Sequence, residues 1–339
     1  MRIVTIAVLT LLPLSLALAE PEDETVFRLY GSVVKVHVDD QNDNHGIGTG
    51  VVVAKDMVAT NCHVIANARG VMVSKGGENY PPVALRADWQ HDLCVMRFDG
   101  LPQEPVELGD SSSLKYEQSV FSIGYSNNAT KPVPAYGKIK ALYALDDSHI
   151  IRTSAPFKMG ASGSALLDDE GRLIGINAFK SPGRNGYYYS LPVEWVKKLL
   201  SAPEVLVATQ TAKPFWDALE QQRPFFMRVV LPLQAERWNE LRPIAKSWCD
   251  AEPDNAEAWY YLALAEDRQG HSIQALQHYQ ETLALNPQHS GALLGLGILS
   301  IYQGRQDEVR KIQSVLESID SESADALKLA ASTAQTITP

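Results

Sequence analysis

Short apolar runs separated by turn-forming residues dominate residues 26–191. The runs are rich in β-branched and aromatic side chains, and clusters of Gly, Asn, Asp and Pro divide them, which is typical of short strands joined by turns. Because helical spacing appears only at residues 192–200, the pattern predicts an all-β barrel or sandwich that ends in one helix. The clearest predicted strands are 33–38, 50–54, 57–60, 71–74, 93–98, 120–123, 150–153, 164–167, 173–177 and 187–191.

Residues 216–325 have a helical pattern with an internal repeat. The period is 34 residues, seen in the pairs Pro253 and Pro287, Ala258 and Ala292, Leu262 and Leu296, and Gly270 and Gly304. This pattern resembles tetratricopeptide repeats, with the clearest units at 254–287 and 288–321. An unrelated helical bundle with a chance period is the alternative. Such helix pairs either recruit a protein partner or brace the neighbouring domain, and the sequence leaves both roles open.

The first 19 residues are predicted to be a signal peptide. Arg2 supplies the positive end, residues 3–18 are almost entirely apolar, and Ala17 and Ala19 form a small-residue cleavage site. We therefore expect an exported protein, periplasmic or secreted, with no membrane span in the mature chain. An uncleaved anchor is the alternative, although spanning takes ~20 apolar residues. The rest divides into a domain at 20–202, a linker at 203–215, a helical domain at 216–325 and a flexible tail at 326–339.

Charge and residue spacing exclude several classes of function. The net charge is −10 and no basic cluster occurs, so neither nucleic acid nor an anionic membrane surface is an expected partner. The sequence contains no His-Glu-x-x-His pair and no clustered Cys/His spacing. We therefore predict neither a metal site nor a cofactor.

Three separate segments contain the residue types of a serine-protease triad. His63 follows a predicted strand, Asp92 precedes another, and Ser162 lies in a glycine-rich turn before a third. A serine hydroxyl becomes a good nucleophile when a histidine takes its proton, and a carboxylate holds that histidine in the required tautomer. The sequence thus predicts Ser162 as nucleophile, His63 as general base and then acid, and Asp92 as the orienting carboxylate.

Other residues near these segments compete for the same roles or support them. Asp88 is the rival carboxylate, and His45 and His91 are read as loop histidines. The backbone amides of Gly160 and Ser162 are expected to donate to the oxyanion of the tetrahedral intermediate, which favours a residue without a Cβ at position 160.

Residues 25–200 resemble the trypsin-like serine proteases, in particular the bacterial high-temperature-requirement (Deg-type) branch. The resemblance implies a double β-barrel and activity as an endopeptidase on proteins. Ser164 departs from the branch, which has a second glycine there, and the branch's usual C-terminal PDZ domain is not visible. The matching segments are Gly48-Thr49-Gly50, Thr60-Asn61-Cys62-His63-Val64, Asp92-Leu93-Cys94-Val95-Met96, Ser122-Ile123-Gly124, Gly160-Ala161-Ser162-Gly163 and Gly171-Arg172-Leu173-Ile174-Gly175-Ile176-Asn177.

By the same resemblance, the pocket for the substrate side chain is formed by residues just before the serine and along the strand after it. No carboxylate occurs in these segments, so cleavage after Lys or Arg is disfavoured and a small or medium apolar side chain is expected. The implied pocket residues are Pro156, Phe157, Ala178 and Phe179.

The three cysteines are Cys62, Cys94 and Cys249. If Asp92 reaches His63, then Cys62 and Cys94 are carried close together, and an exported compartment permits a disulfide between them. Two small buried thiols are an equally good interpretation. The combined prediction is an exported serine endopeptidase whose repeats recruit a protein substrate or partner. The alternative is a catalytically silent protease fold that acts as an adaptor or chaperone-like protein through its repeats.

Overall fold

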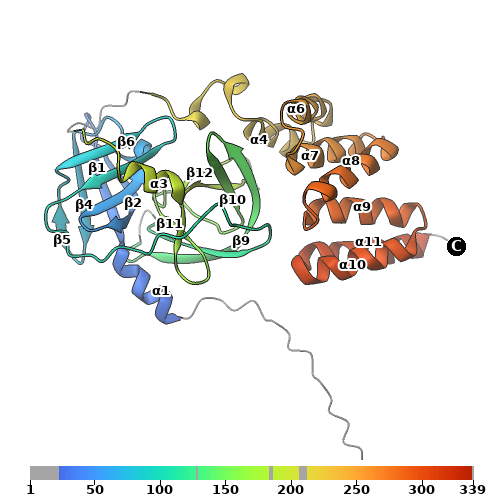
Figure 1. Cartoon of the computed structure of the whole chain (residues 1–339), viewed down its shortest axis with the longest axis horizontal. Coiled ribbons are helices and arrows are strands. Elements are labelled where there is room, and N and C mark those ends of the chain that lie inside the picture. The colour runs from blue at the N-terminus through green and yellow to red at the C-terminus, as the bar shows by residue number, and fades with distance from the viewer. Residues whose placement is uncertain (1–22, 127–128, 183–185, 206–211, 338–339) are drawn as a thin grey trace, which may run out of the picture.

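The computed structural model describes residues 23–126, 129–182, 186–205 and 212–337. The predicted signal peptide lies outside these residues. Two β-sheets occupy one end of the molecule and a stack of helices occupies the other (Figure 1). The fold is therefore an all-β domain of two sheets followed by a helical, repeat-containing region, as the sequence predicts.

The first sheet has seven strands in the order β5-β4-β1-β2-β3-β7-β6. Its neighbours in that order pair antiparallel, and the β3–β7 pairing sets Asn61 opposite Leu93. This register brings the end of β3 beside the start of β7, where two candidate catalytic residues lie. The strands are β1 (Val33–Asp39), β2 (His45–Ala54), β3 (Met57–Asn61), β4 (Gly70–Lys75), β5 (Glu78–Tyr80), β6 (Ala84–Asp88) and β7 (Leu93–Arg97).

The second sheet closes into a six-stranded barrel in the order β10-β13-β12-β11-β8-β9. Every strand predicted from the sequence is present in one of the two sheets. The pattern missed β5, β6 and β9. β5 is short and polar, and β9 contains Pro134, Gly137 and two lysines, so neither has the apolar run that marks a strand. The strands are β8 (Ser119–Gly124), β9 (Val133–Leu145), β10 (Ser148–Thr153), β11 (Ala165–Leu167), β12 (Leu173–Lys180) and β13 (Tyr188–Pro192).

Short helices flank the sheets, and longer ones form the C-terminal stack. The predicted helix after β13 is α3, which packs against both sheets through β7 and β12. The helices, with the 3-10 segments labelled η, are α1 (Asp23–Leu29), η1 (Tyr30–Ser32), α2 (Cys62–Ile65), α3 (Val193–Leu199), η2 (Phe215–Asp217), η3 (Glu220–Gln222), α4 (Phe225–Arg228), α5 (Val230–Gln234), α6 (Trp238–Ala251), α7 (Ala256–Arg268), α8 (Ser272–Leu285), α9 (Ser290–Tyr302), α10 (Gln306–Ile319) and α11 (Ser321–Ile337).

The predicted repeat units correspond to the helix pairs α7–α8 and α9–α10. Gly270 and Gly304 make the turn inside each pair at φ of 78° and 72°, where a Cβ would strain the backbone. Tyr279 of α8 packs on Gly295 of α9, where an added Cβ would lie 2.4 Å from the tyrosine ring. The successive pairs therefore stack closely, as a repeat array requires.

Two predicted boundaries differ from the structure. Residues 326–337, expected as part of a flexible tail, continue helix α11, since Ala324 and Leu327 bury an apolar face against α9 and α10. Near residue 216, the expected start of the helical domain, η2 and η3 come first and α4 is the first α-helix. Before it, Val205 exchanges both backbone hydrogen bonds with Leu85 of β6, so part of the predicted linker adds to the first sheet.

The first helices of the stack share one hydrophobic core with the barrel formed by the second sheet. Phe226 of α4 stacks on Tyr143 of β9 with ring centroids 4.5 Å apart. Arg152 of β10 donates hydrogen bonds to the hydroxyls of Tyr143 (2.8 Å) and Tyr261 of α7 (2.7 Å), and it lies 3.6 Å from Glu257. The barrel and helices α4–α7 are therefore packed as a single hydrophobic unit with a buried polar cluster inside it.

Candidate active site

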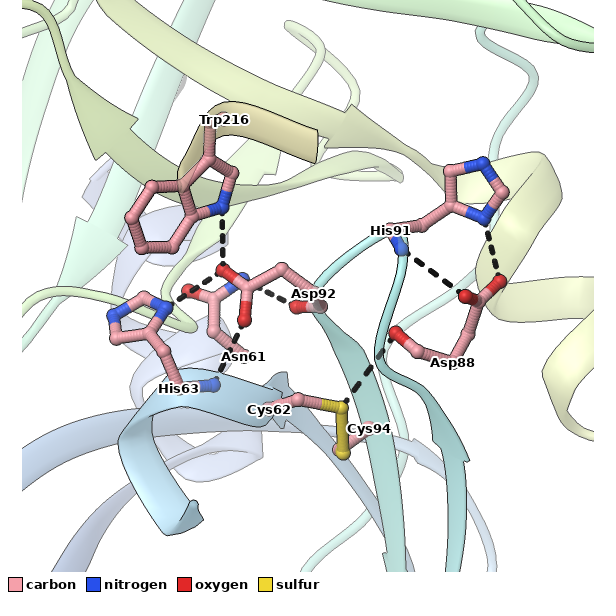
Figure 2. Close-up of a disulfide and its surroundings, with 8 residues drawn as sticks. All are labelled: Asn61, Cys62, His63, Asp88, His91, Asp92, Cys94 and Trp216. Atoms are coloured by element: carbon pink, nitrogen blue, oxygen red, sulfur yellow. Dashed lines mark hydrogen bonds and ion pairs between the residues drawn. A yellow bond between two sulfur atoms is a disulfide. The ribbon is translucent and has the colours of Figure 1, made fainter. Parts of the chain in front are cut away.

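His63 and Asp92 are brought together by the pairing of β3 with β7. His63 lies on the short helix α2 that follows β3, and Asp92 directly precedes β7. Oδ2 of Asp92 lies 2.6 Å from His63 Nδ1, and its Oδ1 accepts the His63 backbone N–H at 2.8 Å (Figure 2). The carboxylate is almost completely buried, whereas the imidazole is 31% exposed. The pair can therefore orient one imidazole nitrogen and leave the other open to a substrate.

The backbone around Asp92 fixes this geometry. Asp92 has a φ of 61°, in the left-handed region that Asp adopts more readily than most residues. Its carbonyl oxygen accepts hydrogen bonds from the Cys62 amide (3.1 Å) and from the side-chain amide of Asn61 (3.2 Å). Both the main chain and the side chain of Asp92 are thus tied to the segment that carries His63.

A disulfide between Cys62 and Cys94 adds a covalent link at the same place. The two Cα atoms are 5.0 Å apart, within the usual range for a disulfide. Cys62 precedes His63, and Cys94 lies two residues after Asp92, so the bond joins the two segments beside the pair (Figure 2). Cys249 is free and buried, and burial raises the pKa of its thiol to about 12.

The rival residues do not face Asp92 or His63. Asp88 pairs with His91, whose Nδ1 lies 2.6 Å from the Asp88 carboxylate, and the other nitrogen of His91 lies 2.7 Å from Asp146. His91 also packs on Trp195 at 4.0 Å and points away from His63 (Figure 2). His45 is exposed and pairs with Asp39.

Ser162 lies in the turn before β11, where hydrogen bonds from the first sheet hold it. The Thr49 amide of β2 donates to the Ser162 carbonyl at 2.9 Å, and the Thr49 hydroxyl donates to the Gly160 carbonyl at 2.9 Å. Thr49 therefore docks the serine turn of the barrel onto the sheet that carries His63. Among the described residues, the hydrogen bonds of His63 go to Asp92, and none joins its ring to the Ser162 hydroxyl.

Two glycines of this turn adopt conformations that other residues disfavour. Gly160 and Gly163 have φ of 90° and 84°, and a Cβ on Gly163 would lie 2.1 Å from the Thr49 carbonyl oxygen. The amides of Gly160 and Ser162 donate to no acceptor among the described residues. Two backbone amides of one turn are therefore left without an acceptor in the described part of the chain, as donors to a substrate oxyanion would be.

Ser164, the departure from the Deg-type pattern, is accommodated by its neighbours. It is fully buried, and its hydroxyl accepts a hydrogen bond from Asn177 Nδ2 at 2.8 Å. Asn177 in turn accepts one from Ser190 at 2.6 Å. Gly124 makes room, because a Cβ at that position would lie 2.4 Å from the Ser164 Cβ. The extra side chain is thus satisfied inside the barrel and does not enter the turn at Ser162.

The four residues expected in the substrate pocket fall into two pairs. Pro156 is exposed, and Phe157 is half-buried with its ring 5.1 Å from that of Tyr188. On β12, Ala178 is buried and Phe179 is half-buried. The Phe179 ring stacks on Tyr189 on one side, at 4.8 Å. Phe179 is connected to the His63–Asp92 pair through a residue that the sequence analysis did not single out.

That residue is Trp216 of η2. Its indole N–H donates to Oδ2 of Asp92 at 3.1 Å, and its ring meets the His63 ring edge-on at 5.5 Å (Figure 2). The same indole stacks on Phe179 at 5.8 Å. The sequence assigned Trp216 to the start of the helical domain. The available signal was the consecutive aromatic residues Phe215 and Trp216, directly after a loosely patterned stretch.

The described part of the chain contains no group of three or more His, Cys, Asp or Glu side chains able to hold a metal ion. Among its helices, none combines the length and the apolar character needed to cross a bilayer.

Family models match both parts of this architecture. Residues 48–176 match the model described as a trypsin-like peptidase domain. Residues 231–337 match the model described as the middle TPR-like domain of cilia and flagella-associated protein 70. The chain therefore contains a trypsin-like peptidase domain, followed by a TPR-like helical region.

Two curated proteins that are similar to the first domain are serine proteases by name. A probable periplasmic serine endoprotease, DegP-like, of Pseudomonas putida is 28% identical over 167 residues, which are 46% of this chain and 34% of that protein. The mitochondrial serine protease HTRA2 of Drosophila grimshawi is 28% identical over 165 residues, 45% of this chain and 38% of that protein. The chain thus spans little more than a third of the length of these curated relatives.

A solved structure agrees with the fold. The active form of the Rv3671c protease from M. tuberculosis superimposes with a TM-score of 0.50 at 20% identity, covering 62% of this chain and all of that one. The peptidase domain is thus of trypsin-like fold with relatives of the DegP/HtrA type.

Proposed function

We propose that this chain is an exported serine endopeptidase that hydrolyses peptide bonds of protein substrates. The observation that carries the proposal is the buried Asp92 carboxylate bound to Nδ1 of a partly exposed His63, on the sheet to which Thr49 docks the Ser162 turn. The DegP-like and HTRA2 relatives are serine proteases by name, which supports the same reaction class.

In this mechanism the Ser162 hydroxyl oxygen attacks the scissile carbonyl carbon while His63 Nε2 takes its proton. Asp92 on Nδ1 holds the imidazole in the tautomer that leaves Nε2 as the base, and it stabilises the imidazolium that forms. His63 then gives the proton to the departing amine, which leaves an acyl-enzyme. Water, deprotonated by His63, attacks the ester and regenerates Ser162.

The amides of Gly160 and Ser162 stabilise the charge that develops on the carbonyl oxygen. Because Gly160 is held at positive φ and neither amide has an acceptor among the described residues, their dipoles can act in the transition state without first breaking another bond. The side chain before the scissile bond contacts Pro156, Phe157, Ala178 and Phe179. These residues are apolar and select a small or medium apolar group.

The repeats have two roles in the proposal. Helices α4–α7 brace the barrel, because they complete its core. The later helices recruit a protein substrate or partner, and the supporting observation is that they expose large apolar side chains: Ile273, Tyr302 and Leu329 are 74%, 80% and 67% exposed. Export through the N-terminal signal peptide places this activity in the periplasm or outside the cell.

Replacement of Ser162 tests the central claim. Ser162→Ala should abolish both casein hydrolysis and labelling by a fluorophosphonate probe. The melting temperature should stay nearly unchanged, since only one hydroxyl of a half-buried side chain is lost. Ser113→Ala, in an exposed loop, is the matched control and should behave as wild type. Wild-type hydrolysis by Ser162→Ala would refute the assignment, and a wild-type chain that neither labels nor cleaves would favour the adaptor alternative.

A further inference from the structure

The connection between the peptidase domain and the helices reaches the proposed catalytic residues. Trp216 follows Asp92 by 124 positions, yet its indole nitrogen lies 3.1 Å from Asp92 Oδ2. The Asp92 carboxylate consequently has three donors: the His63 backbone N–H on Oδ1, and the His63 ring and Trp216 on Oδ2. Since the carboxylate is about 1% exposed, these donors replace the water that an ionised carboxylate would otherwise require.

The segment that carries Trp216 is held on both sides of the site. The Phe215 amide donates to the Gln90 carbonyl at 2.9 Å, two residues before Asp92. The ring of Phe215 meets that of Phe179 edge-on at 5.8 Å, and Trp216 stacks on the same ring at 5.8 Å. The segment is thus fixed to the loop of the first sheet by a hydrogen bond and to β12 of the barrel by two aromatic contacts.

Trp216 restricts both members of the His63–Asp92 pair. Its N–H restricts the rotation of the carboxylate, because Oδ2 would lose this donor if it turned away from its position beside His63 Nδ1. Its ring stands at 88° to the imidazole with centroids 5.5 Å apart, a geometry that is favourable for aromatic pairs. The Trp216 ring consequently limits the movement of the imidazole on the side where the two rings meet.

We propose that Trp216 is a positioning residue of the active site, supplied by the connection to the helical region. The inference rests on the proposed function, since it assumes that His63 and Asp92 act on Ser162. Trp216 acts through Asp92 and His63, so its loss should lower kcat and leave KM little changed. The segment that connects the peptidase domain to the helical region therefore also carries a residue that positions the catalytic pair.

Trp216→Phe tests this proposal, because it keeps an aromatic ring and removes the N–H donor. The matched control is Trp259→Phe, which removes an indole N–H that donates to the Pro253 carbonyl on the repeats at 2.7 Å. On a short chromogenic peptide, Trp216→Phe should lower kcat about 10-fold, near the lower end of the effect of losing a hydrogen bond to a charged group. The downfield proton resonance of His63 Nδ1–H should move in Trp216→Phe and stay unchanged in Trp259→Phe.

The possible outcomes separate this inference from the proposed function. Activity in Ser162→Ala would overturn both. An inactive Ser162→Ala together with wild-type kcat in Trp216→Phe would overturn the role of Trp216 alone, and a kcat above wild type would show that the segment obstructs the site. If Trp216→Phe fails to fold, Phe215→Leu loosens the same segment and keeps the indole. It should lower kcat about 3-fold, a smaller loss than removal of the donor, and wild-type kcat with an unmoved resonance would refute positioning.

Discussion

Removal of the Phe226 side chain should destabilise the barrel and the helices together. Phe226 lies on α4, outside the peptidase domain, and is 2% exposed. It stacks on Tyr143 at 4.5 Å and packs against Tyr189 at 5.6 Å. Tyr189 carries Phe179 on its other side, at 4.8 Å. A cavity at Phe226 therefore opens beneath the aromatic residues that lead to the active site.

The expected cost follows from the type of substitution. Phe→Ala in a core typically costs 3–5 kcal/mol, and the stacked contact with Tyr143 adds to the plain loss of buried area. We therefore expect Phe226→Ala to lower the free energy of unfolding by about 4 kcal/mol, out of a usual total of 5–15 kcal/mol. Phe27→Ala is the matched control. Its ring is 77% exposed, so the cost should stay within about 0.5 kcal/mol.

The cysteines provide a separate probe for each part of the molecule. Cys249 lies buried in α6 and becomes reactive to a thiol reagent when the helices open. Cys62 and Cys94 are at most 1% exposed, so a pulse of reductant reaches their disulfide when the barrel opens. Urea titrations read by mass spectrometry give both midpoints. In Phe226→Ala both should fall by the same amount; a lowered Cys249 midpoint with an unchanged disulfide midpoint would contradict a shared core.

Two further predictions concern His91 and the repeats. Burial by itself lowers the pKa of His91, but hydrogen bonds to Asp88 and Asp146 outweigh this and raise the pKa above its ordinary 6.5; the resulting stability is complete below pH ~6.5 and is lost as pH rises through the raised value. Urea unfolding should therefore show wild type losing stability relative to His91→Gln as the pH rises above ~6.5, and parallel curves would count against the paired-carboxylate effect. Tyr302→Ser should slow hydrolysis of a protein substrate at least ~3-fold through lost recruitment while short-peptide turnover stays at the wild-type rate. If Tyr302→Ser hydrolyses the protein substrate as fast as wild type does, Tyr302 is not part of the recruiting surface.

The packing between barrel and helices changes how a recruiting role can be tested. Deletion of everything after residue 202 would remove Trp216 from the active site and expose Tyr143 and Tyr189. Loss of peptide turnover in such a truncation would follow from those contacts alone. Substitutions on exposed residues of the full chain are therefore the informative experiments.

The sequence by itself determined the architecture and the residues of the candidate triad. Strands along 26–191 could be predicted because buried strands need local runs of β-branched residues, and the repeats because stacked helix pairs need small residues and turn glycines at a fixed period. His63, Asp92 and Ser162 stood out because each lies in a short motif at a strand end. Their local patterns are sufficient to name them, although 99 positions separate His63 from Ser162.

Only the tertiary structure decided which residues from distant parts of the chain come into contact, because the local sequence around such residues does not indicate their partners. Whether Cys62 and Cys94 meet is set by the β3–β7 register, and the fit of Ser164 depends on Gly124 and Asn177 across the barrel. Asp88 and Asp92 both lie within three residues of His91 in sequence, and the folded chain sets His91 against Asp88 and His63 against Asp92. Trp216 carries no periodicity that would mark its place, because a single side chain in a connecting segment is positioned by the surfaces on which it packs. For the same reason, the docking of Phe226 and its helix on the barrel could be known only from the folded chain.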